Sequence, residues 1–207
     1  MHDGTHAATM SAHWGGGVSP FGATWQKTMM WIFIITDALL FSGLLCGYGY
    51  LRMAGQLAWP QTSHVFSIPF IALMTFILIT SSMTMGTAVT AARLGDRRRA
   101  VANLVFTIVG GVAFLCCQAY EWTHLIREGA RLWSNPWGAP QFGASFFVLT
   151  GFHGSHVFSG LVILIVTAIR TNLGKTPAQG VEMAGLYWHF VDLVWVFIFT
   201  LFYLLPN

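Results

Sequence analysis

Five long apolar segments constrain this chain of 207 residues more than any other feature of its sequence. They cover about residues 28–50, 65–92, 100–126, 142–169 and 185–205. Each is longer than the roughly 18 residues that distinguish a membrane-spanning helix from a buried helix of a soluble protein. Charged residues make up only 8% of the chain, whereas a soluble domain carries roughly 25%. The sequence therefore predicts an all-α membrane protein, with a five-transmembrane-helix bundle over residues 27–207 and a polar tail, rich in His and Gly, over residues 1–26.

The basic residues between the segments predict an orientation in the membrane. On one side of the bundle lie Lys27, the segment 93–99, Arg170 and Lys175, and on the other side lie Arg52, Arg127 and Arg131. Lys and Arg concentrate in cytoplasmic loops. We therefore expect the N-terminus in the cytoplasm and the C-terminus outside.

Charge and cysteine content exclude several other classes of protein. The formal net charge of +3 comes from few Lys and Arg residues, and it does not suggest a nucleic-acid partner. Cys46, Cys116 and Cys117 all lie within apolar segments, and none belongs to a C-x-x-C pair. Their odd number leaves no complete disulfide framework. We interpret them as small buried apolar residues.

Polar side chains inside the apolar segments are the candidate functional residues, because an ionisable group in hydrocarbon is energetically costly. They are Asp37 in the first segment, Gln118, Glu121 and His124 on one face of the third, His153 and His156 in the fourth, and His189 and Asp192 in the fifth. Two interpretations are open. The groups can hydrogen-bond across the bundle and hold the helices in register, or they can serve a function, which a carboxyl near the middle of a span such as Asp37 favours.

Small residues predict where helices approach closely. Gly43 and Gly47 are four residues apart, and Gly151, Ser155 and Ser159 repeat at the same spacing. This spacing places them on one helix face, where they allow close backbone contact in lipid.

A cofactor bound by this chain is the less favoured alternative. His153, His156 and His189 have the residue type of haem ligands, but His153 and His156 are too close on one helix to ligate two stacked haems. Glu121-x-x-His124 resembles half of a di-iron motif, and the chain has no second copy. Ser155 and His156 are neighbours on a helix and point apart, so they do not form a nucleophile–base pair. We expect no metal site, no haem and no catalytic residue in this chain.

The tail carries His2, Asp3, His6 and His13. His titrates near neutral pH, so such a cluster could relay protons, and a His-rich tract could also bind a metal. A polar terminal segment without either role is the third possibility.

Four motifs together resemble the subunit III family of haem-copper terminal oxidases. They are Gly185-Leu-Tyr-Trp-His189-Phe-Val-Asp192 in the fifth segment, Thr150-Gly-Phe-His153-Gly-Ser-His156 in the fourth, Cys117-Gln118-Ala-Tyr-Glu121-Trp in the third, and Leu78-Ile-Thr-Ser-Ser in the second. The resemblance covers about residues 27–205. Mitochondrial-type members have seven spans, and this chain resembles the shorter bacterial form, which lacks the first two and occurs in quinol oxidases and some cytochrome c oxidases.

The resemblance implies a multi-pass subunit of the bacterial cytoplasmic (inner) membrane that carries no redox centre. Haems and copper would belong to partner subunits I and II, and a small subunit IV and a larger respiratory supercomplex are further possible partners. The family subunit packs on subunit I, encloses phospholipids in a cleft, supports proton uptake and protects the catalytic subunit during turnover. Asp37 would correspond to a buried family carboxyl, which is a Glu in many relatives. The His-bearing tail would lie near the proton entrance of subunit I.

An accessory five-helix protein of a nitric oxide reductase system shares the same core and is the alternative that the resemblance leaves open. An autonomous membrane cytochrome or transporter is less favoured, because haem-ligand spacing, inverted repeats and interrupted helices are absent from the sequence.

Overall fold

The computed structural model describes residues 24–54, 59–60, 65–134 and 136–205. It contains five long helices: α2 (Trp25–Ala54), α4 (Ile68–Arg93), α5 (Arg97–Arg127), α6 (Pro140–Asn172) and α7 (Ala178–Ile198). A π-helix, η1 (Phe199–Leu204), continues α7. The described residues form no β-strand beyond an isolated bridge between Arg131 and Ser134. All five helices are long and apolar enough to cross a membrane, which confirms the predicted number of spans.

Helices α2, α5 and α6 extend beyond the predicted apolar segments at both ends because their polar ends are also helical, whereas α4 begins three residues later than predicted, at Ile68. The largest difference is in α7, which begins at Ala178, whereas the apolar segment begins at Gly185. The residues from Ala178 to Glu182 are therefore helical, although they lie outside the predicted apolar segment. Pro177, with a fixed φ, precedes the helix and suits a helix start. The first turns of α7 carry polar residues because they lie at the end of the bundle, outside its apolar middle.

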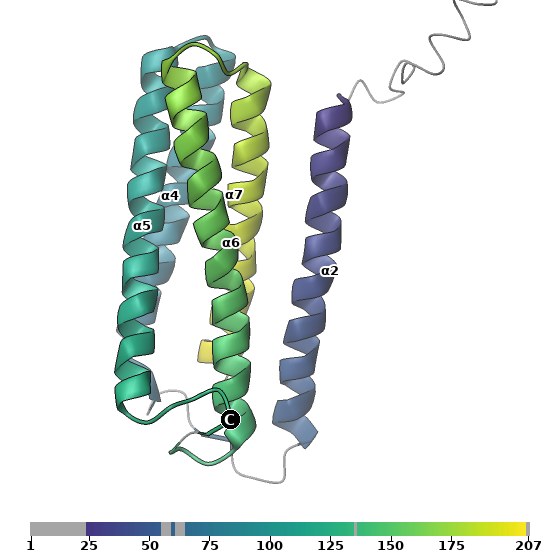
Figure 1. Ribbon diagram of the computed structural model, residues 1–207, viewed down its shortest axis with the longest axis vertical. Coiled ribbons are helices and arrows are strands. Elements are labelled where there is room, and N and C mark those ends of the chain that lie inside the picture. The colour runs from purple at the N-terminus through teal and green to yellow at the C-terminus, as the bar shows by residue number, and fades with distance from the viewer. Residues whose placement is uncertain (1–23, 55–58, 61–64, 135, 206–207) are drawn as a thin grey trace, which may run out of the picture.

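Short turns join the helices at one end of the bundle (Figure 1). Asp96 caps α5 by accepting a hydrogen bond from the Arg99 amide at 3.1 Å, which satisfies one of the free amides at the helix start. Gly95 and Gly174 follow α4 and α6 with φ of +77° and +69°. This left-handed conformation ends a helix at little cost only in glycine.

Helices α4, α5, α6 and α7 form a four-helix bundle, and α2 lies alongside it against α6 and α7 (Figure 1). Polar contacts hold α2 at both ends. Lys27 Nζ lies 2.6 Å from Glu182, which also pairs with Arg93 at 2.9 Å. At the other end, the Tyr48 hydroxyl donates to the Leu201 carbonyl at 3.3 Å, and Arg52 donates to the Leu205 carbonyl at 3.2 Å. Lys27, Arg93 and Glu182 thus meet at one end of the bundle. Successive spans run in opposite directions, so the start of α2, the end of α4 and the start of α7 lie at the same end.

The core is packed around tryptophans of α7. Trp188 is fully buried, and its indole donates to the Ser81 hydroxyl at 3.1 Å. A Cβ built on Gly111 would lie 2.5 Å from the Trp188 ring, and one on Gly160 would lie 3.1 Å from it. These two glycines therefore create the space for the indole ring.

The predicted small-residue contacts are confirmed only in part. On α6, a Cβ on Gly151 would meet the Trp122 ring at 3.0 Å, and the Ser159 hydroxyl lies 2.7 Å from the Tyr187 hydroxyl. On α2, a Cβ on either Gly43 or Gly47 would have no described neighbour within 4 Å. The prediction of close helix packing at Gly43 and Gly47 is therefore wrong. Both glycines instead line a cavity of about 250 Å³ between α2 and α6.

Large apolar side chains cover the outside of the bundle, among them Leu39, Phe76 and Phe106, which are 69%, 67% and 64% exposed. Such a surface suits hydrocarbon rather than water. The chain is therefore a multi-pass membrane protein.

Candidate functional site

Asp37 lies in the middle of α2 and faces α6. Its side chain is buried, and Oδ2 lies 3.3 Å from Nε2 of His156. The other ring nitrogen of His156, Nδ1, lies 2.8 Å from the Phe152 carbonyl oxygen. Because a carbonyl only accepts, Nδ1 carries a proton. Nε2 is therefore the ring nitrogen that faces Asp37, although Oδ2 makes no hydrogen bond of good geometry among the described residues.

Aromatic and hydroxyl side chains surround the Asp37–His156 pair. The His156 ring lies 5.1 Å from the Phe41 ring, centre to centre. Tyr187 of α7 donates to the His156 carbonyl at 3.3 Å. The pair therefore lies where α2, α6 and α7 meet, and the two side chains approach each other across the bundle.

His153, one turn before His156, has a different environment. It is fully buried, and neither ring nitrogen has a hydrogen-bond partner among the described residues. Its ring lies 5.2 Å from the Trp195 ring and 5.9 Å from the Phe114 ring. Of the two open interpretations, hydrogen bonding across the bundle does not describe His153 within the described residues, where it packs as a core side chain.

His189 and Asp192 both face α4. His189 Nδ1 lies 2.6 Å from the Ser82 hydroxyl. Asp192 is 7% exposed, and among the described residues neither of its carboxyl oxygens has a hydrogen bond of good geometry. Both residues and Ser82 line a cavity of about 230 Å³ between α4 and α7.

Gln118 and Glu121 form a third polar cluster near the other end of the bundle. Oε2 of Glu121 accepts a hydrogen bond from Gln118 Nε2 at 3.1 Å and one from the Tyr203 hydroxyl at 3.2 Å. The π-helix η1 supplies Tyr203, which is buried. The second oxygen, Oε1, has no partner among the described residues, and an unsatisfied buried polar atom costs about 1–3 kcal/mol.

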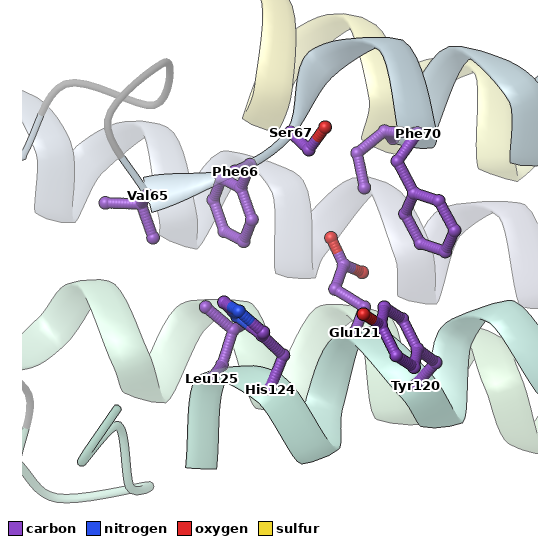
Figure 2. A pocket seen from close by; sticks show the side chains of 9 residues that line it. Val65, Phe66, Ser67, Phe70, Tyr120, Glu121, His124 and Leu125 are labelled. Atoms are coloured by element: carbon purple, nitrogen blue, oxygen red, sulfur yellow. The ribbon is translucent and has the colours of Figure 1, made fainter. Parts of the chain in front are cut away.

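Glu121 lines a cavity of about 240 Å³ between the start of α4 and the last turns of α5, which we term the Glu121 pocket (Figure 2). Its other lining residues include Val65, Phe66, Phe70, Tyr120 and His124. His124 shares the face of Glu121, as predicted, but its side chain is 58% exposed and lies 3.5 Å from Glu128. It therefore lines the pocket without joining the buried hydrogen bonds.

The three histidines of the spans have separate surroundings: His156 contacts Asp37, His189 contacts Ser82, and aromatic rings enclose His153. In the part of the chain that the structure describes, no three His, Cys, Asp or Glu side chains are grouped as metal ligands would be. Cys46, Cys116 and Cys117 are free thiols, and the prediction that all three are buried is wrong, because Cys46 and Cys116 are exposed on the outside of this chain. The predicted tail residues His2, Asp3, His6 and His13 lie outside the described residues.

Sequence reasoning found the buried acids and histidines but missed their partners. The Ser82 hydroxyl contacts His189 and the Tyr203 hydroxyl contacts Glu121, whereas the Tyr187 hydroxyl donates to the backbone carbonyl of His156. Ser82 lies within the quoted motif beginning at Leu78, so that motif carried a signal. No sequence motif pointed to Tyr203, because its position depends on the π-helical winding of η1.

Comparison with known proteins identifies the family to which this polar bundle belongs. A family profile described as "Cytochrome c oxidase subunit III" matches residues 9–206, nearly the whole chain. The chain belongs to the cytochrome c oxidase subunit III family. The match includes all five spans and the four motifs that contain the residues described above.

Three relatives of this subunit III chain illustrate names of two kinds. A "Probable quinol oxidase subunit 3" of Staphylococcus saprophyticus is 34% identical over 184 residues, which are 87% of this chain and 89% of the relative. A "Cytochrome c oxidase subunit 3" of Corynebacterium diphtheriae is 36% identical over 177 residues, 83% of this chain and 84% of the relative. A "Probable quinol oxidase subunit 3" of Staphylococcus aureus is 35% identical over 183 residues, again 87% and 89%. These matches show a subunit III of the haem-copper oxidases and leave the electron donor open.

Proposed function

We propose that this chain is the non-redox subunit III of a proton-pumping terminal oxidase, which reduces O2 to water in aerobic respiration. It packs on subunit I in the bacterial cytoplasmic (inner) membrane, with its N-terminus in the cytoplasm and its C-terminus outside. Subunits I and II, which hold the haems and copper, are its partners, with a small subunit IV and a larger supercomplex as further ones. The names of the relatives favour an oxidase over the accessory protein of a nitric oxide reductase system.

The observation that carries this proposal is the Asp37–His156 pair at the junction of α2, α6 and α7. A carboxyl in the middle of a span needs a polar partner, and His156 provides one at 3.3 Å. A carboxyl and an imidazole side by side can both bind and release protons. This chemistry supports a role in proton uptake rather than in electron transfer.

The cavity between α2 and α6 supports the second part of the proposal, which is lipid binding. Gly43 and Gly47 leave it open on α2, and Leu51, Val148 and Leu149 give it apolar walls. Its volume of about 250 Å³ and its position along two spans suit an acyl chain. A bound phospholipid would fill the gap that these glycines leave and would stabilise the packing of α2 against the bundle.

The test is to purify the oxidase from cells with and without this chain and to follow it through sustained turnover. We expect the complex without the chain to retain its haems and to lose activity after fewer turnovers, with slower proton uptake and less bound phospholipid. Equal lifetime, proton uptake and lipid content in the two preparations would refute the proposed role. The His2, His6 and His13 tail is tested separately by replacing all three with Gln and measuring proton uptake.

A further inference from the structure

The Glu121 pocket has one acceptor that the protein does not use. Both hydrogen bonds to the carboxyl, from Gln118 and Tyr203, go to Oε2, and Oε1 has no partner in the described part of the chain. The side chain is 6% exposed, so bulk water does not satisfy this oxygen. Oε1 itself is covered in this structure, so in the carboxylate form of Glu121 it accepts from a donor in the pocket once a wall side chain shifts aside.

The walls of the pocket select the kind of molecule that carries this donor. Figure 2 shows the Glu121 carboxyl extending from α5 toward Phe66 and Phe70 at the start of α4. The Tyr120 ring meets the Phe70 ring edge-on, with 5.6 Å between centres. A ring between aromatic walls gains favourable stacking contacts. An apolar cavity of roughly 150 Å³ already holds benzene, so about 240 Å³ admits a substituted ring.

The position of the pocket indicates a membrane-soluble ligand. Glu121 lies six residues before Arg127, the last residue of α5, which is about 9 Å along the helix axis. The pocket is therefore near the end of a span, where polar heads of amphiphiles meet the hydrocarbon. Its outward-facing residues Tyr120 and His124 are exposed, whereas Val65, Phe66 and Leu125 form a buried floor.

We propose that the Glu121 pocket binds the hydroxylated ring of a membrane amphiphile, with a ring hydroxyl donating a hydrogen bond to Oε1 of Glu121. The hydroquinone form of an isoprenoid quinone carries such a ring, and so does a hydroxylated polycyclic lipid. The proposal concerns binding alone and involves no electron transfer by this chain. It is independent of the lipid and proton roles of the α2–α6 region.

The Glu121→Gln variant provides a sharp test, because it changes the chemistry of the pocket rather than removing it. Gln118 Nε2 and Tyr203 both donate at the Oε2 position, so the new amide places its oxygen there. Its NH2 group then takes the position of Oε1. The acceptor in the pocket becomes a donor, and the variant should prefer a quinone carbonyl to a hydroquinone hydroxyl.

The experiment uses the intact oxidase complex in nanodiscs depleted of endogenous quinone, under anaerobic conditions and at mildly alkaline pH. A photoreactive hydroquinone is crosslinked, and labelling is read only on the peptide of this chain that contains Tyr120 and Glu121. Unlabelled hydroquinone and quinone with the same tail then compete with the probe. We expect the hydroquinone to compete at least tenfold better in the wild type, with the order reversed in Glu121→Gln.

Two further variants keep the result interpretable. Asp192→Asn removes a buried carboxyl outside the pocket and should leave labelling and preference unchanged. Phe70→Ala removes a pocket wall and should weaken labelling several-fold without reversing the preference. The wild-type competition alone tests the proposal if Glu121→Gln fails to assemble.

The competition also distinguishes the two sources of the ring. Stronger competition by a hydroxylated polycyclic lipid than by hydroquinone would support the same chemistry with a lipid as the ligand. Equal competition by hydroquinone and quinone in the wild type, an unreversed preference in Glu121→Gln, or no label on this peptide would each overturn the proposal.

Discussion

Gly111 in α5 is the position where the addition of one methyl group tests the packing of the core most directly. A Cβ there would lie 2.5 Å from Cη2 of Trp188 and 2.8 Å from Cδ2 of Leu161. Carbon atoms pack at about 3.5–4.0 Å, so the fully buried Trp188 ring would have to move by about 1 Å. We therefore predict that Gly111→Ala destabilises the bundle, although the same change usually favours a helix.

The magnitude follows from two opposing contributions. Overpacking a core costs about 1–3 kcal/mol, and replacing Gly by Ala within a helix stabilises it by about 1 kcal/mol. The expected net loss is about 1 kcal/mol, from the middle of the overpacking range. Gly154 of α6 is the matched control, because a Cβ there has no described neighbour within 4 Å. Gly154→Ala should gain up to about 1 kcal/mol.

The assay is an SDS titration of the purified chain in mild detergent, followed by tryptophan fluorescence. Gly111→Ala should unfold at a lower SDS fraction than the wild type, and Gly154→Ala at an equal or higher one. Trp188→Phe removes the part of the ring that clashes, so Gly111→Ala should cost less in that background. Equal midpoints for the two alanine variants, or no coupling with Trp188→Phe, would refute this account of the packing.

Three other changes test the polar contacts. Glu182→Gln weakens the ion pairs that hold α2, so amide exchange in the first turns of α2 should rise, with only a small stability loss because exposed pairs contribute about 0–1 kcal/mol; unchanged exchange would argue against this anchor. Asp37→Asn should leave assembly intact but reduce lipid retention or proton uptake under turnover, whereas an unaltered purified complex would count against its role. Tyr203→Phe removes one of two donors to Glu121 and should cost about 1 kcal/mol in an SDS titration, and a wild-type midpoint would show that the bond does not matter.

The number and type of helices were predictable from sequence because the bilayer imposes one requirement on every span, a length of apolar residues. The helix ends were not. The polar segment that contains Gln179 and Glu182 has the composition of a loop, yet it is helical, because Glu182 pairs with Lys27 and Arg93 from two other helices. Sequence spacing does not show contacts between distant segments.

The candidate residues were predictable for a similar reason, and their individual environments were not. Any ionisable group in an apolar span is conspicuous, which identified Asp37, Glu121 and His153 alike. The structure assigns them different surroundings: a histidine for Asp37, a pocket for Glu121, and aromatic rings for His153. The small residues show the same difference between pattern and environment. Residues four apart on α2 line a cavity, whereas residues with the same spacing on α6 contact other helices.

The most direct test of the central claim is a reduced-minus-oxidised visible spectrum, recorded on the complex that co-purifies with a tag on this chain and on the isolated chain. The account predicts the absorption of oxidase haems in the complex and a colourless isolated chain, as expected of a subunit III without redox centres. Haem that stays with the isolated chain would contradict it and would make His153, His156 and His189 ligand candidates again.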